Sequence, residues 1–131
     1  MTLRLKAPVK LQLSKSGKYY NLNLNNYRNW HYRTSNNLKQ RFKDIILKGL
    51  KSFNEELADV VRITYTLYVN DNRKKDLANV LAVVDKFLCD ALIVAGVIPD
   101  DNYNHLVEVV YSFGGKVEGE AYVDVLVEAI S

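Results

Sequence analysis

The chain has 131 residues, nearly half of them apolar and a quarter charged, a composition that fits one globular domain with its own core. The single Cys89 excludes an intramolecular disulfide framework and fits a reducing compartment, and one cysteine with two histidines cannot form a structural zinc site. Residues 1–20 lack the continuous apolar segment of a signal peptide, and no apolar run is long enough to span a membrane. We therefore expect a cytoplasmic protein without a membrane segment.

The net charge of +3 conceals an uneven distribution along the chain. Residues 1–51 contain twelve Lys/Arg and one acid, a net charge of +11, whereas residues 52–131 contain six Lys/Arg and fourteen acids, a net charge of −8. A basic half suggests a polyanionic partner, and an acidic half lying on nucleic acid would be repelled unless cations intervened. The division suggests a basic surface for a phosphate backbone and a carboxylate cluster loaded with metal, although charged helix surfaces alone account for it equally well.

The first third of the chain predicts a broken strand and then an irregular segment. A proline interrupts an alternation of apolar residues, which is typical of an edge or irregular strand; the alternating residues are Leu3, Leu5, Val9, Leu11 and Leu13. Residues 19–37 are rich in Asn and Tyr, and Asn clusters favour turns and local side-chain hydrogen bonds. Interleaved basic and aromatic groups suit phosphate contacts and stacking on DNA. The alternative is a capped loop whose aromatic residues pack into the core, which accounts for Trp30 better than for the clustered Arg and His.

The middle of the chain predicts a helix and a strand. Ser35 is an N-cap candidate for an amphipathic helix that runs to about Phe53. Lys39 belongs to its basic surface, which is either simply solvated or part of a DNA-facing surface. Strict alternation from Asp59 to Val69 is the clearest strand signal in the sequence.

The last third predicts a helix followed by two strands. The helix runs from Leu77 to Ala95, where Gly96 is a natural C-cap. His105 to Phe113 and Ala121 to Ile130 read as strands, and the glycines between them predict a hairpin. The order of elements indicates a single α+β (mixed α/β) domain over residues 1–131, with one sheet of about four strands backed by two main helices. A right-handed crossover around the second helix can place its flanking strands parallel.

The second helix carries more polar groups than a core element needs. At about 100° per residue, Asp76, Asn79, Lys86 and Asp90 share one stripe, while Asp85 lies on a different face. A polar stripe is also the normal surface of a half-exposed helix, and an acid at a helix start also serves as a cap. Carboxylates and water suit magnesium, which can activate water against a phosphodiester, and a lysine can steady a phosphate or the leaving oxygen.

These residues carry a resemblance to a known family. The runs RKKDLAN, DKFLCDAL and AGVIPDDNY, with NNYRNWHY upstream, resemble the RusA family of Holliday-junction resolvases, particularly its phage and prophage members. That family carries a basic stretch, a D-x-D-N entry to a helix, a helical lysine followed by D-A-L, a glycine and a closing D-D. The resemblance implies a small homodimeric endonuclease that uses Mg²⁺, with Mn²⁺ as a substitute. It would resolve Holliday junctions and other branched DNA in recombination, repair or phage DNA processing, in the cytoplasm of a bacterium or a phage-infected host.

The resemblance assigns roles by position, with one departure. Asp76 matches the first motif acid, Lys86 the helical lysine and Asp101 the acid of the closing pair. The second motif acid is Ala78 here, and four more residues, about one helical turn, separate the motif from the lysine. Asp85 is the nearest substitute carboxylate. Its place on another face, about 13 Å along the helix from Asp76, argues against the two sharing one metal.

Helix length limits which acids can meet. A helix over residues 77–95 is about 28 Å long, and the segment that follows it reaches at most about 20 Å to Asp101. Within one chain, Asp101 can therefore approach Asp85 and Lys86 but hardly Asp76, unless the helix is shorter or bent. The alternative is that Asp76 meets Asp101 of the partner subunit in a two-fold dimer.

The leading hypothesis is thus a metal-dependent, structure-selective DNA endonuclease. Its candidate catalytic residues are Asp76, Asp85, Lys86 and Asp101. Its candidate metal ligands are Asp76, Asp85, Asp100 and Asp101. Its candidate DNA contacts are Arg73, Lys74, Lys75, Arg28, Arg33, Lys39, Trp30 and His31. The alternatives are a catalytically inactive DNA-binding protein of the same fold and an oligomeric structural domain whose acids only solvate it.

Overall fold

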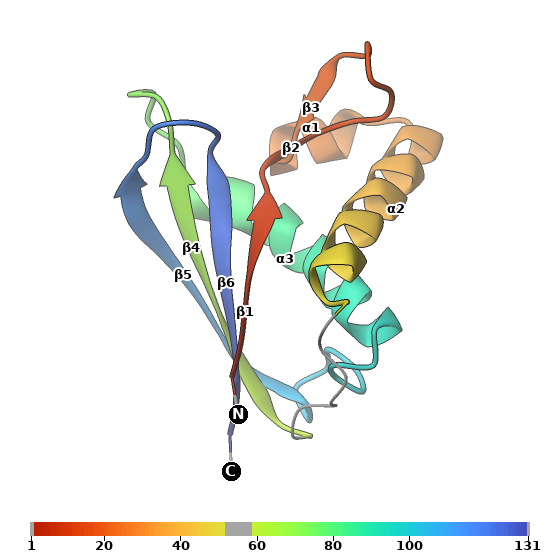
Figure 1. Ribbon diagram of the computed structural model, residues 1–131, viewed down its shortest axis with the longest axis vertical. Helices are drawn as coiled ribbons and strands as arrows, with labels where there is room; N and C mark the ends of the chain where they lie inside the picture. Colours follow the sequence, from red (N-terminus) through yellow and green to blue (C-terminus); the bar gives the residue numbers. More distant parts are fainter. Residues whose placement is uncertain (1, 52–58, 131) are drawn as a thin grey trace.

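Strand β4 (Val61–Val69) lies inside the main sheet of the computed structural model, which describes residues 2–51 and 59–130. Its odd-numbered residues are buried and its even-numbered ones half-buried, because successive side chains of a strand point to opposite faces of the sheet. It pairs in parallel with β5 (Leu106–Lys116) and antiparallel with β6 (Tyr122–Ala129). With β1 (Thr2–Pro8), the sheet has the order β1-β6-β4-β5 (Figure 1). The predicted mixed α/β class is confirmed, as is the edge position of the first strand.

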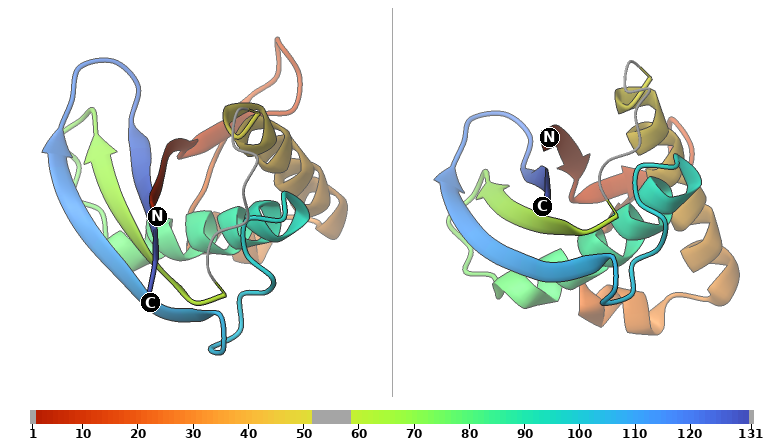
Figure 2. Two further views of the ribbon diagram at one scale, coloured as in Figure 1. Left: turned by 60° about the horizontal axis from the view of Figure 1, so that its bottom comes forward. Right: turned by 90° about the horizontal axis from the view of Figure 1, so that it is seen from below.

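Two long helices lie on one side of this sheet. Helix α3 (Leu77–Val94) runs along the sheet face and buries nine of its residues, and α2 (Tyr32–Gly49) packs against α3 (Figures 1 and 2). The rings of Phe42 and Phe87 meet edge to face between the helices, with centroids 5.7 Å apart. As predicted, α3 ends before Gly96, whose φ of +76° is the left-handed conformation of a C-terminal glycine.

The Asn-rich segment is more regular than the sequence predicted. Its first residues form β3 (Tyr19–Asn21), which pairs with β2 (Lys10–Gln12), and helix α1 (Leu24–Asn29) follows. The side chain of Asn23 accepts a hydrogen bond from the backbone N–H of Asn26 at 2.8 Å, so one asparagine caps a helix instead of ending regular structure.

The predicted start of the first long helix was also wrong. The N-cap of α2 is His31, whose Nδ1 accepts from the N–H of Arg33 at 3.2 Å, and Ser35 lies inside the helix. The helix ends at Gly49, and the predicted end at Phe53 falls outside the described residues.

The predicted hairpin of the last two strands is wrong, because β4 lies between β5 and β6. The expected parallel pairing of the strands that flank α3 is confirmed. One of the glycines that suggested a tight turn has a different role. A Cβ on Gly114 would come within 2.5 Å of the Tyr68 ring, and the β4–β5 register shifts between Leu67 and Tyr68. Gly114 therefore lets β5 pass close to the side chains of β4.

No helix among the described residues combines the length and apolar character needed to cross a membrane.

Candidate functional site

One open pocket brings three of the predicted site residues together. Asp85, Lys86 and Asp101 all line a cavity of about 510 Å³ between α3, the loop that follows it and the start of β5. Leu106 and Val109 supply part of its apolar wall. We call this cavity the acidic pocket. The expectation that Asp101 approaches Asp85 and Lys86 within one chain agrees with this arrangement.

Three hydrogen bonds hold the carboxylate of Asp85. The buried hydroxyl of Tyr65 on β4 donates to its Oδ1 at 2.6 Å, and the thiol of Cys89 donates to the same oxygen at 3.3 Å. The hydroxyl of Tyr111 on β5 donates to Oδ2 at 3.2 Å. The carboxylate therefore bridges the helix and the two parallel strands at a fixed position.

The three donors stay protonated over a wide pH range. Burial raises the pKa of Tyr65 well above its ordinary value, and the neighbouring thiol and carboxylate raise it further. Burial, then Asp85, likewise raises the pKa of Cys89 and of Tyr111. A hydroxyl or thiol can donate to a carboxylate only while it carries its proton. The hydrogen bonds to Asp85 therefore persist at neutral pH.

The sequence did not identify Tyr65 and Tyr111 as part of the site. Tyr65 occupies a buried position of the β4 alternation, where a tyrosine hydroxyl requires a polar partner. The need for a polar partner was the one sign in the sequence that Tyr65 contacts a site residue. The partner itself lies 20 residues from Tyr65 and 26 from Tyr111, so only the fold identifies it.

The closing acids differ in their environments. Asp100 accepts hydrogen bonds from the N–H of Asp101 and the side-chain amide of Asn102, each at 2.8 Å, and these bonds lower its pKa. Partial burial raises the pKa of Asp101, and the adjacent carboxylates of Asp100 and Asp90 add to the shift. Burial therefore disfavours the charged form of Asp101, and the neighbouring carboxylates disfavour it further.

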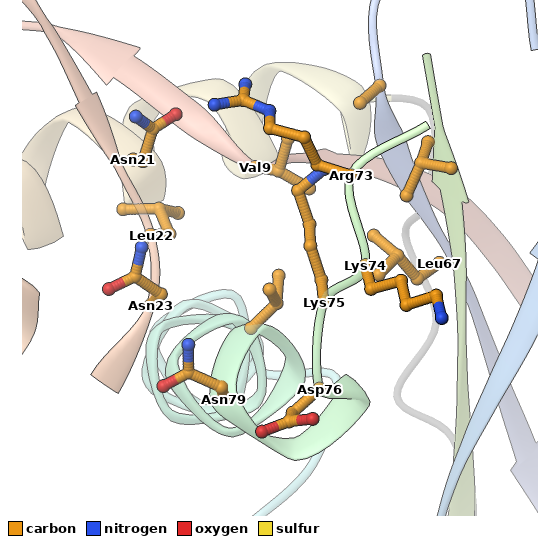
Figure 3. A pocket seen from close by; sticks show the side chains of 13 residues that line it. Val9, Asn21, Leu22, Asn23, Leu67, Arg73, Lys74, Lys75, Asp76 and Asn79 are labelled. Atoms are coloured by element: carbon orange, nitrogen blue, oxygen red, sulfur yellow. The ribbon is translucent and has the colours of Figure 1, made fainter. Parts of the chain in front are cut away.

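Asp76 lies in a different pocket. It is the N-cap residue of α3, and within the described residues its side chain makes no capping hydrogen bond. With Arg73, Lys74, Lys75 and Asn79 it lines a cavity of about 420 Å³, closed on the other side by Asn21–Asn23 (Figure 3). We call this cavity the basic pocket. Asp76 and Asp101 therefore do not share a pocket in one chain.

The basic triplet is partly neutralised within the chain. Asp71 pairs with the guanidinium of Arg73 at 3.2 Å and with the ammonium of Lys75 at 2.9 Å. The hydrogen bond from Lys75, then that from the backbone of Arg73, lowers the pKa of Asp71 to about 2. The side chain of Arg73 is 84% exposed, so its charge is still presented to solvent.

The upstream DNA-contact candidates divide into exposed and packed residues. Arg28, His31 and Arg33 are exposed, whereas Lys39 is half-buried on α2. The ring of Trp30 packs edge-on against Tyr20 and Tyr27, with centroids 6.3 and 6.0 Å apart. The core-packing alternative therefore describes Trp30. The exposed basic residues keep their side chains in solvent.

The carboxylates of the described residues do not gather into a cluster of metal ligands. Nowhere in residues 2–51 and 59–130 are three or more His, Cys, Asp or Glu side chains grouped to hold an ion. Two carboxylates with water form a usual set for Mg²⁺, which keeps several waters. Asp85 and Asp101 are the two carboxylates that line one pocket.

Comparison of the chain with protein-family models and with curated proteins found no significant match.

Proposed function

We propose that the protein is a metal-dependent, structure-selective endonuclease that resolves four-way junctions and other branched DNA. The observation that carries this proposal is the acidic pocket, where Asp85, Lys86 and Asp101 converge from α3 and the loop before β5. Carboxylates and a lysine lining one pocket are the kinds of group that phosphodiester cleavage uses. The resemblance to RusA resolvases supplies the DNA substrate and the cytoplasm of a bacterium or phage-infected host as the location.

Mg²⁺, or Mn²⁺ in its place, would be held by Asp101 and Asp85, with Asp100 and Asp76 as further candidates. The bound ion supplies an activated water and charge neutralisation at the phosphate. The hydrogen bonds from Tyr65, Cys89 and Tyr111 fix Asp85 and leave lone-pair capacity on its Oδ2. Lys86, whose ammonium lies 5.8 Å from the centroid of the Tyr27 ring, would contact a backbone phosphate.

A second copy of the chain would dock along β5, which makes the homodimer part of this proposal. The strand has eleven residues and lies at the edge of the described sheet, with Val109 and Phe113 40% and 60% exposed. Val109 lines the acidic pocket near one end of β5. Near the other end, Phe113 and Lys116 line a cavity shared with Lys74. Antiparallel pairing about a two-fold axis would place each acidic pocket beside the partner's basic end.

The second candidate is a catalytically inactive DNA-binding protein of the same fold. Ala78 replaces a motif acid, and the described residues contain no cluster of three metal-ligating groups. Those two observations favour a protein that has lost its catalytic activity. The basic first half of the chain would still attract DNA.

The test is to incubate the purified protein with a four-way junction and a matched duplex, with and without Mg²⁺ or Mn²⁺, beside Asp101→Asn. The proposal expects metal-dependent nicking of the junction by the wild type and junction binding without nicking by the variant. Junction binding with no nicking under varied pH and salt supports the inactive protein instead. Absence of binding above the salt-sensitive background rejects both.

A further inference from the structure

The basic pocket has the size and lining of a small-molecule site. Its cations alone would predict only phosphate contacts. Its volume of about 420 Å³ lies within the range of about 300–1,000 Å³ that is common for ligand pockets. Leu22, Leu67 and Val80, which are buried, supply an apolar floor. An apolar floor below a few polar groups suits a flat ring held face-down with its edge toward the polar groups.

Positive charge is concentrated on one part of the rim. Arg73 and Lys75 are tied to each other through Asp71, and Figure 3 shows their side chains across the opening from the carboxylate of Asp76. Asp71 restrains both cations without covering the exposed guanidinium. A phosphate group would therefore be bound on the Arg73 side, away from Asp76.

The rest of the rim offers free amide groups. Within the described residues the side chains of Asn21 and Asn79 make no hydrogen bond, and the Asn23 side chain uses only its oxygen, as the cap of α1. Each free amide presents both donors and an acceptor, which is the complement of the edge of a nucleobase. Asp76 adds acceptors for an exocyclic amino group.

We propose that the basic pocket binds one nucleoside monophosphate unit, with the base on the apolar floor, its edge at the asparagines and its phosphate at Arg73. The unit comes either from an unpaired nucleotide of a DNA strand or from a free nucleotide. The first source rests on the proposed nuclease function, because branched DNA can present an unpaired nucleotide at its branch point, which a matched duplex does not.

The binding test needs no catalysis. Isotope-labelled full-length protein is titrated in EDTA with deoxyadenosine monophosphate, deoxyadenosine and inorganic phosphate, while backbone and side-chain amide resonances are followed. We expect saturable shifts at Asn21 and Asn79 with the nucleotide, weaker binding of the nucleoside, and no comparable shifts with phosphate. Equal responses to nucleotide and phosphate, or no response at these amides, overturn the proposal.

Two variants and a control make the test specific. Ala121→Trp fills the pocket from a loop, and Asn79→Leu removes one amide if the tryptophan variant does not fold. Each should weaken nucleotide binding by about tenfold or more, equivalent to about 1.4 kcal/mol. Ala95→Trp, at the exposed opposite end of α3, should bind as the wild type does. Unchanged affinity in Ala121→Trp or Asn79→Leu overturns the proposal.

Whether the bound nucleotide comes from a DNA strand or from solution is tested by the fluorescence of DNA that carries 2-aminopurine at an unpaired branch position. A rise in fluorescence on binding to the wild type, absent in Ala121→Trp, assigns the pocket to the DNA strand. Nucleotide binding without that rise assigns it to free nucleotides. Failure of the nuclease proposal is separate, because it appears as absent cleavage while titration in EDTA still shows nucleotide binding.

Discussion

Replacing Tyr65 with phenylalanine tests whether Asp85 is held as a fixed carboxylate. The substitution keeps the ring, which is fully buried, and removes the hydroxyl that donates to Asp85 Oδ1 at 2.6 Å. A hydrogen bond to a charged group contributes about 1.5–3 kcal/mol. Because Cys89 and Tyr111 still donate to the carboxylate, we expect a loss of about 2 kcal/mol in the free energy of unfolding.

Urea unfolding followed by circular dichroism measures this loss, and it should lower the midpoint by about 1 M for a domain of this size. The matched control is Tyr68→Phe, because the hydroxyl of Tyr68 makes no hydrogen bond within the described residues and its ring stacks on Tyr122 at 4.9 Å. That variant should lose less than about 0.5 kcal/mol. In an Asp85→Ala background the cost of Tyr65→Phe should shrink. Equal losses for the two tyrosines, or an unchanged cost without Asp85, would refute the reasoning.

Three further predictions concern packing, pH and assembly. Gly114→Ala places a methyl group within 2.5 Å of the Tyr68 ring and should cost about 1–3 kcal/mol in thermal or urea unfolding, whereas Gly49→Ala, with no described atom within 4 Å of the added carbon, should not destabilise the protein. The raised pKa values of Tyr65 and Cys89 mean that folding favours their protonated forms, so their contribution to stability is complete below their ordinary values of 10 and 9 and is lost as pH rises above them. Urea midpoints should therefore fall above about pH 9, less steeply in Tyr65→Phe, and a flat profile would contradict this. Val109→Lys puts a charge on the exposed face of β5 and should convert a dimer to a monomer in light scattering, whereas an unchanged dimer would remove β5 from the interface.

The elements that could be predicted from the sequence are those whose signals are local. The alternation of β4 and the glycine after α3 each determine a backbone conformation through neighbouring residues alone. Strand pairing is not local, and Gly114-Gly115 has the same sequence signature whether it forms a tight turn or lies within β5, with Gly114 against Tyr68 of β4. For that reason the hairpin prediction failed while the strands themselves were found.

The residues of the candidate site also divide into those that local sequence signals identify and those that only the folded sheet brings together. Helix length alone predicts that within one chain Asp101 can approach Asp85 but hardly Asp76, and the two separate pockets agree with that inference. The Asn-rich segment predicts irregular structure because Asn favours turns, but the same side chain also caps helices, as Asn23 does. The tyrosine donors to Asp85 come from two strands that meet only in the folded sheet, so their role could not be read from spacing.

The rate of junction nicking by Asp101→Asn, relative to the wild type, tests the central claim most directly. If the acidic pocket is where DNA is cut, this substitution should lower the metal-dependent rate by about a hundredfold or more while junction affinity stays within a few-fold of the wild type. Asp44→Asn, at an exposed acid of α2, should cleave at the wild-type rate. Nicking by Asp101→Asn at the wild-type rate, or no metal-dependent nicking by the wild type, would contradict the claim.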